Sequence, residues 1–344
     1  MNETISERKK QHLLIAAMDE VQMAQSTGLE LIRFEPRALP ELNLHDINTG
    51  CTFLGKALSQ PLMIASMSGG FEESQRLNER LAQAAEQHQI ALALGSMRIA
   101  IEHASQRGAF ELRHIAPSIP ILANLGGAQV RAKHGVAHAL QCIEIAQADA
   151  LIVHLNPLQE ALQPGGDTQW RGLAAALQRL IQESPVAVVV KEVGHGIGPA
   201  TFRQLLDLGV QYIDLAGAGG TSWAAIETRR GDTLKQAAVG EIFHDFGISL
   251  TETLRAITTD PSLRSDAQII ASGGLRSGLD VARAIRLGAH MGSAAAPFLK
   301  AAQAGQDALN DLIEAWHEQL RITCFITASC DLEGLRRAPL IEPR

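Results

Sequence analysis

Four polar side chains follow one apolar run in the middle of the sequence and could carry acid–base or metal chemistry. The run ALIVHLN ends with His154 and Asn156, and Gln159 and Glu160 follow within about one helical turn. Strand alternation sends His154 and Asn156 to the same side, where an imidazole and amides can orient or move a proton. Glu160 is a hard oxygen ligand, so we expect it to bind Mg²⁺ together with substrate phosphate oxygens. Asp167 could assist, although an Asx turn explains this aspartate equally well.

Two segments late in the sequence, rich in glycine and alanine, have the composition of a phosphate site. ASGGLRSG contains Gly273 and Gly274, where backbone N–H groups can approach an anion without a Cβ in the way. SAAAPF contains Ala295 and Ala296 at the start of a helical pattern, and helix starts attract anions. For the glycines alone, a pair of tight turns is the alternative. Taken together, the two segments favour phosphate binding.

Basic side chains occur in three other places. Arg98 ends the segment GSMR, and arginine suits bidentate contacts with phosphate. Arg8, Lys9 and His12 belong to the charged segment ERKKQH, and such short charge runs are mostly solvated helix faces. Lys191 ends the run VAVVVK, where a lysine usually extends past apolar surface or bridges to a carboxylate.

The elements that must position these side chains are short apolar runs that recur along the chain. There are eight of them, most followed by a helical pattern: 61–66, 91–96, 121–126, 150–156, 186–194, 212–220, 268–274 and 290–296. Most are uniformly apolar, as strands buried on both faces should be. The pattern predicts an α/β fold, a (β/α)8 TIM barrel, with a doubly wound open sheet as the main rival.

In such a barrel the reactive residues lie at the carboxyl ends of the strands. We expect a ring of polar groups there, formed by Ser66, Met67 and Ser68; Ser96 and Arg98; Asn124; His154, Asn156, Gln159 and Glu160; Lys191 and Glu192; Thr221; and Gly273, Gly274 and Arg276. Each alone could be a cap or turn residue, but packing does not explain the whole ring.

Two segments do not fit the bare barrel. Residues 1–60 precede the first strand and should form an N-terminal extension, a helix and a cap. Residues 221–249 form an insertion after strand 6 that is too long for an ordinary loop, and such loops are usually functional. No linker is evident, so we expect a single domain over 1–344.

Composition argues against several classes of protein. The net charge of −7 disfavours general nucleic-acid binding, so an anionic ligand needs a local basic cluster. Four cysteines without metal-site spacing indicate reduced thiols. The charged start is unlike a signal peptide, and no uncharged apolar run reaches about 18 residues. We therefore expect a cytoplasmic protein without a membrane span.

Along nearly all its length the sequence resembles the type 2 isopentenyl diphosphate isomerases. The motifs that carry the resemblance are RKKQH (8–12), ASMSGG (65–70), GSMR (95–98), HLNPLQE (154–160), VKEVGHGI (190–197), GAGGTSW (217–223) and ASGGLRSG (271–278). The resemblance implies FMN, Mg²⁺ and a reductant such as NADPH. It further implies interconversion of isopentenyl and dimethylallyl diphosphates by proton addition and removal, with reduced FMN as the acid and base. Barrels of this kind commonly assemble symmetrically, so we expect a homo-oligomer, a tetramer or an octamer.

The resemblance also implies roles for individual residues. FMN would contact Ser66, Met67, Ser68, Ser96, Asn124, Lys191 and Thr221, and its phosphate would contact Gly273, Gly274, Leu275, Arg276, Ala295 and Ala296. The substrate would be bound by Arg8, Lys9, Ser96, Met97, Arg98, His154, Asn156 and Gln159. Catalysis would fall to Gln159, His154 and Lys191, with Lys191 beside flavin N1 and O2. Glu160 would bind Mg²⁺.

The sequence departs from this family at a few positions and leaves two alternatives. Serine stands at Ser68 where threonine is usual, methionine at Met97 in place of glutamine, and alanine at Ala216 in place of a flavin-contacting serine. An FMN-dependent 2-hydroxy acid oxidase would need a histidine on a late loop, and GAGGTSW and ASGGLRSG contain none. A non-enzymatic flavin redox sensor would need an output module, which nothing in the sequence supports.

Overall fold

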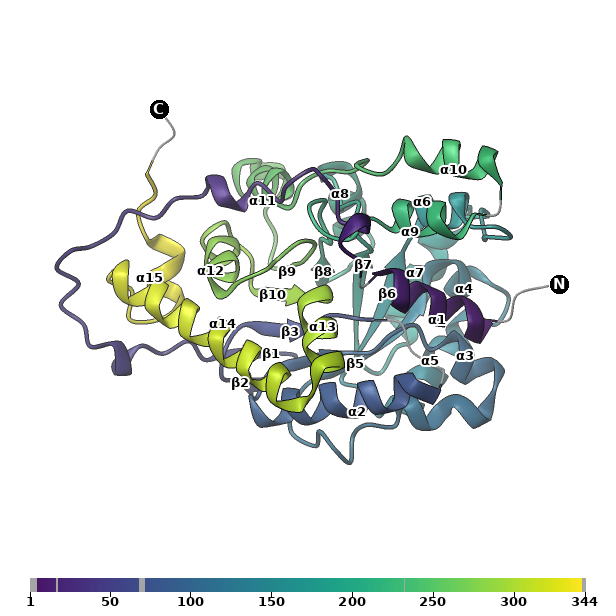
Figure 1. The fold of residues 1–344 in the computed structure, drawn as a ribbon, viewed down its shortest axis with the longest axis horizontal. Coiled ribbons are helices and arrows are strands. Elements are labelled where there is room, and N and C mark those ends of the chain that lie inside the picture. Colours follow the sequence, from purple (N-terminus) through teal and green to yellow (C-terminus); the bar gives the residue numbers. More distant parts are fainter. Residues whose placement is uncertain (1–4, 17, 68–71, 232, 342–344) are drawn as a thin grey trace.

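The computed structural model of the protein describes residues 5–16, 18–67, 72–231 and 233–341. Eight parallel strands form a closed barrel: β3 (Leu62–Ile64), β4 (Ala91–Ala93), β5 (Ile121–Gly126), β6 (Ala150–Leu155), β7 (Ala187–Glu192), β8 (Tyr212–Asp214), β9 (Gln268–Ala271) and β10 (Met291–Ala294). Each strand pairs with the next along the chain, and β10 closes the ring against β3. The predicted (β/α)8 TIM barrel is confirmed, and the rival open sheet is wrong (Figure 1).

Strand β7 shows why a uniformly apolar run suits this barrel. Its even-numbered valines pack outward with residues of the helical layer, whereas Val189 lies in the cluster that fills the inside of the barrel. Alternation therefore sends Lys191, two residues later, to the inner side at the end of the strand. The register pairs Lys191 with His154 on β6 and with Asp214 on β8, so these three residues are neighbours across the sheet.

A hairpin closes the amino-terminal end of the barrel. Strands β1 (Cys51–Phe53) and β2 (Lys56–Leu58) pair antiparallel, and Phe53 and Leu58 join the inner apolar cluster. The ring of Phe53 meets that of Tyr212 edge-on with centroids 5.9 Å apart, an arrangement that aromatic rings favour. Apolar side chains therefore fill this end, and the polar groups lie at the carboxyl ends of the strands.

Helices form an outer layer around the barrel. They are α2 (Glu72–Gln87), α3 (Arg98–Glu102), α4 (Gly127–Arg131), α5 (Gly135–Ala146), α6 (Pro157–Leu162), α7 (Leu173–Glu183), α8 (Pro199–Asp207), α11 (Leu250–Thr259), α12 (Gly278–Arg286), α13 (Ala296–Ala304), α14 (Gln306–Ile326) and α15 (Leu332–Arg337). Two 3-10 helices, η4 (Ala104–Phe110) and η5 (Pro261–Leu263), lie between them. The Ser277 side chain caps α12 by accepting a hydrogen bond from the N–H of Asp280. None of the described helices combines the length and the apolar character needed to span a membrane.

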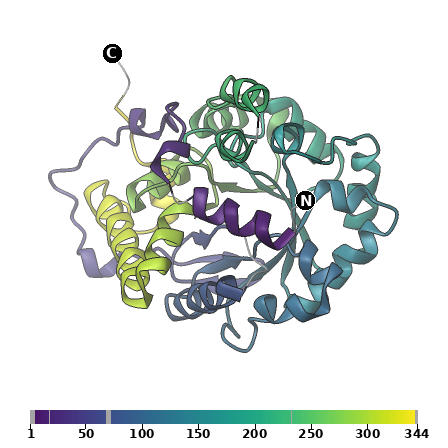
Figure 2. The same ribbon diagram turned by 45° about the vertical axis from the view of Figure 1, so that its right-hand side comes forward.

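The segment before the barrel runs across its mouth and then on to the hairpin. Helix α1 (Ile5–Ala16) lies across the barrel in Figure 2 and contacts α9. Three short 3-10 helices follow, η1 (Asp19–Val21), η2 (Leu29–Leu31) and η3 (Leu44–Asp46). The backbone N–H of Met23 donates to the carbonyl oxygen of Gly220 at 2.8 Å, which fastens this segment to the loop after β8.

The insertion at 221–249 folds into two helices. Helix α9 (Trp223–Arg230) begins at the N-cap Ser222, and α10 (Leu234–Glu241) begins at a capping box formed by Thr233 and Gln236. Helix α9 packs against both α1 and α6. Because α6 follows β6 directly, the insertion contributes its residues to the carboxyl-terminal end of the barrel.

Candidate active site

A hydrogen-bonded chain links residues from three barrel strands at the mouth. Asn124 donates through Nδ2 to Ser66 Oγ at 2.8 Å, and its Oδ1 lies 2.7 Å from His154 Nδ1. An amide oxygen only accepts, so His154 carries its proton on Nδ1 and keeps a lone pair on Nε2. Burial and the charges of Lys191 and Lys9 lower the pKa of His154 to about 3. His154 is therefore a neutral hydrogen-bonding group at neutral pH.

Lys191 is a nearly buried cation among these polar strand ends, 8% exposed. Its Nζ donates to the carbonyl oxygen of Glu192 at 2.5 Å. The carboxylate of Glu192 in turn accepts from the backbone N–H groups of Gly194 and His195 at 2.6 and 2.5 Å. These bonds fix the backbone just after the lysine, so the ammonium group is held at the mouth.

Helix α9 supplies a carboxylate that the sequence analysis did not single out. Glu227 Oε1 accepts a hydrogen bond from Gln159 Nε2 at 3.1 Å and lies 2.8 Å from His12 Nε2. Its Oε2 lies 2.5 Å from Arg230 Nη1. The ring of Trp223 meets the His12 ring edge-on at 5.1 Å. We call Gln159, Glu227, His12 and Arg230 the α9 cluster.

Glu227 holds its negative charge although it is buried. Burial alone would raise the pKa of its carboxyl, but the hydrogen bond and charge of His12 and the charge of Arg230 outweigh burial and lower it. Glu227 is 2% exposed, and the Arg230 side chain is 4% exposed. A buried carboxylate held between an amide and an imidazole can take a proton from a molecule bound beside it.

The interpretation of ERKKQH as a solvated helix face is wrong for two of its residues. Lys9 and His12 are 7% and 6% exposed, because this side of α1 packs on the mouth and on α9. Lys9 Nζ donates to the carbonyl oxygen of Ser96 at 2.7 Å. Burial, followed by the charges of Arg8 and Arg98, lowers the pKa of Lys9 to about 7. We call Arg8, Lys9 and Arg98 the basic cluster, and their mutual repulsion favours an anion there.

The start of α6 brings an amide and a carboxylate together. Asn156 Nδ2 donates to Gln159 Oε1 at 3.0 Å and to Glu160 Oε1 at 3.1 Å. Glu160 Oε2 accepts from the N–H of Asp167 at 2.8 Å, and Asp167 Oδ1 accepts from the N–H of Gln169 at 3.1 Å, an Asx turn. Among the described residues, no group of three or more His, Cys, Asp or Glu could hold a metal ion. A metal at Glu160 would therefore need oxygen ligands from a bound substrate or water.

Close backbone packing explains the glycine pair after β9. Gly273 and Gly274 have φ angles of 91° and 83°, and Cβ atoms there would lie 1.9 Å from the carbonyl oxygen of Gly217 and 2.3 Å from that of Gly219. The tight-turn alternative thus accounts for both glycines without a ligand. The alanine segment differs, because Ala296 opens α13 and the first N–H groups of a helix have no partner within it.

Two further predicted residues join through a glutamine of the N-terminal segment. Thr221 Oγ1 accepts from Gln22 Nε2 at 3.0 Å, and Gln22 Oε1 accepts from Arg276 Nη2 at 3.3 Å. Leu275, between the glycines and Arg276, is 1% exposed and packs in the hydrophobic core. The loops after β8 and β9 are therefore tied to each other by Gln22.

Methionines at two strand ends pack with the hydrophobic core. Met67 is half-buried against it, and Met97 is fully buried within it. Because Met97 is 0% exposed and its backbone N–H donates to the carbonyl oxygen of Asn124, its assignment to the substrate stays a prediction. Ser68 lies outside the described residues, so its assignment also stays a prediction.

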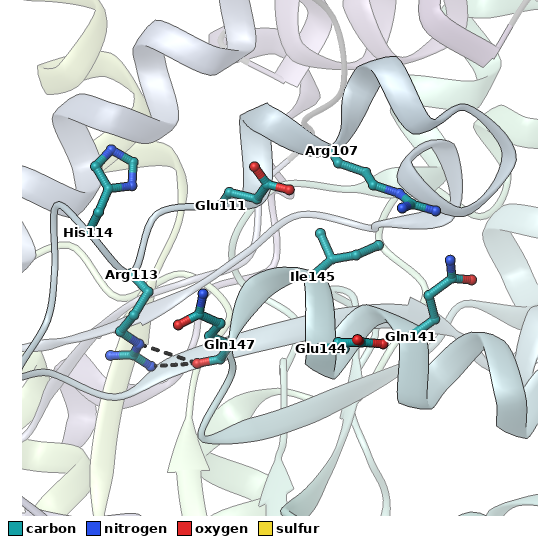
Figure 3. A pocket seen from close by; sticks show the side chains of 8 residues that line it. All are labelled: Arg107, Glu111, Arg113, His114, Gln141, Glu144, Ile145 and Gln147. Atoms are coloured by element: carbon teal, nitrogen blue, oxygen red, sulfur yellow. Dashed lines mark hydrogen bonds between the residues drawn. The ribbon is translucent and has the colours of Figure 1, made fainter.

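A surface cavity of about 570 Å³ lies elsewhere on the molecule, beside α5 and the segment after η4 (Figure 3). It is lined by Arg107, Glu111, Arg113, His114, Gln141, Glu144, Ile145 and Gln147. Arg113 donates to the carbonyl oxygen of Gln147 and to Asp149 at 2.9 and 2.6 Å, so it fastens neighbouring segments. No residue predicted for the site lines this cavity.

Comparison with known proteins agrees with this geometry. The family of FMN-dependent dehydrogenases matches residues 1–115 and 159–342. An isopentenyl-diphosphate delta-isomerase of Pseudescherichia vulneris is 46% identical over 98% of this chain and 97% of its own length. A protein of the same name from Nostoc sp. is 42% identical over 97% of this chain and 95% of its own. A mutant mandelate oxidase with a monooxide FMN adduct is 19% identical, with a TM-score of 0.64 over 97% of this chain and 92% of that one, which shows the fold alone. The chain belongs to the isopentenyl-diphosphate delta-isomerases, a family of enzymes, and with them to the FMN-dependent dehydrogenase family.

Proposed function

We propose that the protein interconverts isopentenyl diphosphate and dimethylallyl diphosphate, with reduced FMN as cofactor and no net redox change in the substrate. The observation that carries the proposal is the position of the α9 cluster beside the basic cluster. Arg8 interacts electrostatically with Arg98, with Glu160 and with Glu227, so groups that attract an anion and groups that handle a proton share one site. The names of the relatives support the same conclusion.

The residues at the mouth fit a flavin and its phosphate. The start of α13 and the backbone at the glycine pair offer N–H groups without bulky side chains. Lys191 would stabilise negative charge on the ring, and the Asn124–Ser66 pair offers hydrogen bonds to its polar edge. When bound, reduced FMN would supply a weakly acidic N–H for protonation of the alkene. The match to FMN-dependent dehydrogenases supports this cofactor.

The substrate diphosphate would bind at the basic cluster, with the allylic end toward the α9 cluster. The Arg98 side chain is partly exposed and Lys9 is nearly buried. When the diphosphate binds, Arg98 would therefore lose more bound water than Lys9. Glu160 would hold Mg²⁺ against the diphosphate oxygens. His154, with its pKa near 3, would donate hydrogen bonds or accept them but would not act as an acid. Proton removal at C2 would fall to the carboxylate of Glu227, with Gln159 orienting the transfer.

The remaining proposals rest on the family resemblance. NADPH would keep the flavin reduced, and the protein would form a tetramer or an octamer, since oligomers are mostly symmetric. A cytoplasmic location fits the four cysteines, which are all free thiols.

A product assay separates the isomerase from the 2-hydroxy acid oxidase. Purified protein with FMN, Mg²⁺ and dithionite should convert isopentenyl diphosphate to dimethylallyl diphosphate. The same protein with oxidised FMN and lactate or mandelate should form no hydrogen peroxide. Peroxide formation without isomerisation would replace the isomerase by the oxidase.

Substrate binding should take up a proton at alkaline pH through Lys9. Its pKa of about 7 is lowered in the free protein, and a bound diphosphate raises it again because the charged form is then favoured. At about pH 8.5 binding should take up close to one proton, and at about pH 6 almost none, because Lys9 is then already charged. Calorimetric titration in buffers of different ionisation enthalpy measures this uptake. Lys9→Arg should abolish it, and an uptake that persists would assign the proton to another group.

Replacing Glu160 should weaken Mg²⁺ binding, and so raise the Mg²⁺ concentration that activity requires, without loss of flavin. Glu160→Gln keeps the acceptor for the N–H of Asp167 but removes the charge, so the Mg²⁺ concentration for half-maximal activity should rise about tenfold or more. Asp167→Asn is the matched control, because its side chain closes an Asx turn, and its Mg²⁺ dependence should be unchanged. Loss of FMN from Glu160→Gln would show that the carboxylate is structural.

A further inference from the structure

The guanidinium group of Arg230 bonds to two helices at once. Its Nη1 lies 2.5 Å from Glu227 Oε2 on its own helix α9, and its Nε donates to Gln11 Oε1 on α1 at 3.1 Å. The side chains of Arg230 and Glu227 are almost fully buried, whereas Gln11 is exposed. A planar guanidinium presents its donors in a fixed fork. The orientation of Arg230 is therefore tied both to the carboxylate and to α1.

A second contact joins the same two helices beside this one. His12, the residue after Gln11, lies with its Nε2 2.8 Å from Glu227 Oε1. Two successive residues of α1 thus meet two residues of α9, Glu227 and Arg230, that are three positions apart and share one face of that helix. Two neighbouring contacts fix the position of one helix along the other, which a single contact would leave free to pivot.

Helix α1 also carries Arg8 and Lys9 of the basic cluster. Arg8 precedes His12 by four residues, so these two side chains lie on the same face of α1. Arg8 interacts electrostatically with both Arg230 and Glu227. A shift of α1 along α9 would therefore move the groups that bind the diphosphate relative to the carboxylate that accepts the proton.

We propose that Arg230 is a positioning residue that sets the register of α1 against α9, so that the diphosphate-binding groups and the Glu227 carboxylate face the same substrate. The proposal rests on the proposed function, because it presupposes that the basic cluster and the α9 cluster bind one substrate. Arg230 acts through its neighbours and not on the substrate itself. Its contact with Glu227 orients the carboxylate, and its bond to Gln11 holds α1 in place for the diphosphate.

Two substitutions separate these two contacts. Gln11→Ala removes only the bond to α1. The dissociation constant of inorganic diphosphate, measured by calorimetry with Mg²⁺, and the KM for isopentenyl diphosphate should both rise about fivefold, the effect of one lost hydrogen bond, with kcat little changed. Arg230→Gln also frees the carboxylate of Glu227, and a displacement of about 1 Å should lower kcat about a hundredfold. The affinity for FMN should change in neither variant.

Arg230→Lys decides whether geometry matters beyond charge. Lysine keeps a positive charge beside Glu227, but its ammonium group lacks the fork that spans the carboxylate and Gln11, so kcat should stay within about tenfold of the wild type. Diphosphate binding should weaken as much as in Gln11→Ala. Adding Gln11→Ala to Arg230→Lys should weaken it no further, because both changes break the same bond. Arg229→Gln, at an exposed neighbour on α9, is the matched control and should alter none of these quantities.

Full diphosphate affinity in Gln11→Ala or in Arg230→Lys would overturn the inference, and so would equal losses from Gln11→Ala in both backgrounds. A folded Arg230→Gln variant with near-normal kcat, or one that loses FMN, would overturn it as well. If Arg230→Gln does not fold, the diphosphate affinities of the other two variants decide. Wild-type protein that binds diphosphate but forms no dimethylallyl diphosphate would instead overturn the proposed function. The diphosphate affinities, which need no turnover, would then still show whether Arg230 holds α1.

Discussion

Glu227→Gln should lower kcat for isomerisation about a thousandfold while the protein still binds FMN. The carboxylate oxygens of Glu227 accept from His12, Gln159 and Arg230 at once. A glutamine has one oxygen and one amino group, so at least one of these donors would face another donor. The substitution also replaces the carboxylate, which is placed to accept a proton, by a neutral amide that cannot accept one. Groups that transfer a proton in this way contribute about 10²–10⁴ in rate. Steady-state kinetics with saturating substrate measures the effect.

Glu227→Gln should also destabilise the fold. The experiment must therefore separate this loss of stability from the loss of kcat. The Arg230 side chain is 4% exposed, and breaking a buried ion pair costs about 3–5 kcal/mol. Denaturant unfolding of the FMN-bound protein gives this cost, and activity is compared at temperatures where both proteins are folded. Glu241→Gln, an exposed carboxylate at the end of α10, should change neither quantity. A folded Glu227→Gln variant with near-normal kcat would remove the α9 cluster from catalysis.

Gln159→Asn should lower kcat about a hundredfold with little change in the affinities for substrate and FMN. Gln159 is 7% exposed and bridges Asn156 and Glu227 through its two amide atoms. Asparagine keeps the amide but withdraws it by one methylene, and a displacement of about 1 Å can cost about 10²-fold in a positioned transfer. An amide is neither a strong acid nor a strong base, so its role would be to orient the proton transfer.

Gln60→Asn provides the matched control for Gln159→Asn. Gln60 is also a buried glutamine, 2% exposed, but it precedes β3 at the opposite end of the barrel. It should alter stability without altering kcat. If both variants lost activity in proportion to stability, Gln159 would be a packing residue and would leave the mechanism.

The barrel could be predicted because its signal is local. Runs such as VAVVV (186–190) are apolar at every position, as strands buried on both faces should be, and helical patterns follow most of them. Helix starts carry a local signal too, because serine is a favoured N-cap residue and Ser277 caps α12. The course of the N-terminal segment could not be read in this way. Charged residues of α1 look like a solvated face until the helix is packed on the barrel mouth, and that packing depends on contacts with residues more than 200 positions away.

The candidate site was predictable where it lies at strand ends and not where it depends on tertiary contacts. His154 and Lys191 lie near the ends of apolar strands and Asn156 directly follows one, so their positions follow from the pattern. Glu227 does not, because it lies on an inserted helix and meets Gln159 only when α9 packs on α6. A signal for it existed in the length of the insertion and in the four-residue spacing of Trp223 and Glu227 on one helix face. Without His12 opposite, that spacing is also typical of an ordinary surface helix.

The central claim is that the protein moves protons with a reduced flavin and leaves the substrate at the same oxidation level. The most direct test counts NADPH consumed against dimethylallyl diphosphate formed from isopentenyl diphosphate under anaerobic conditions. We predict no product with oxidised FMN alone, product once NADPH or dithionite has reduced the flavin, and many turnovers for each reductant molecule consumed. Consumption of one NADPH for each product molecule would contradict the account and identify the enzyme as an oxidoreductase acting on its substrate.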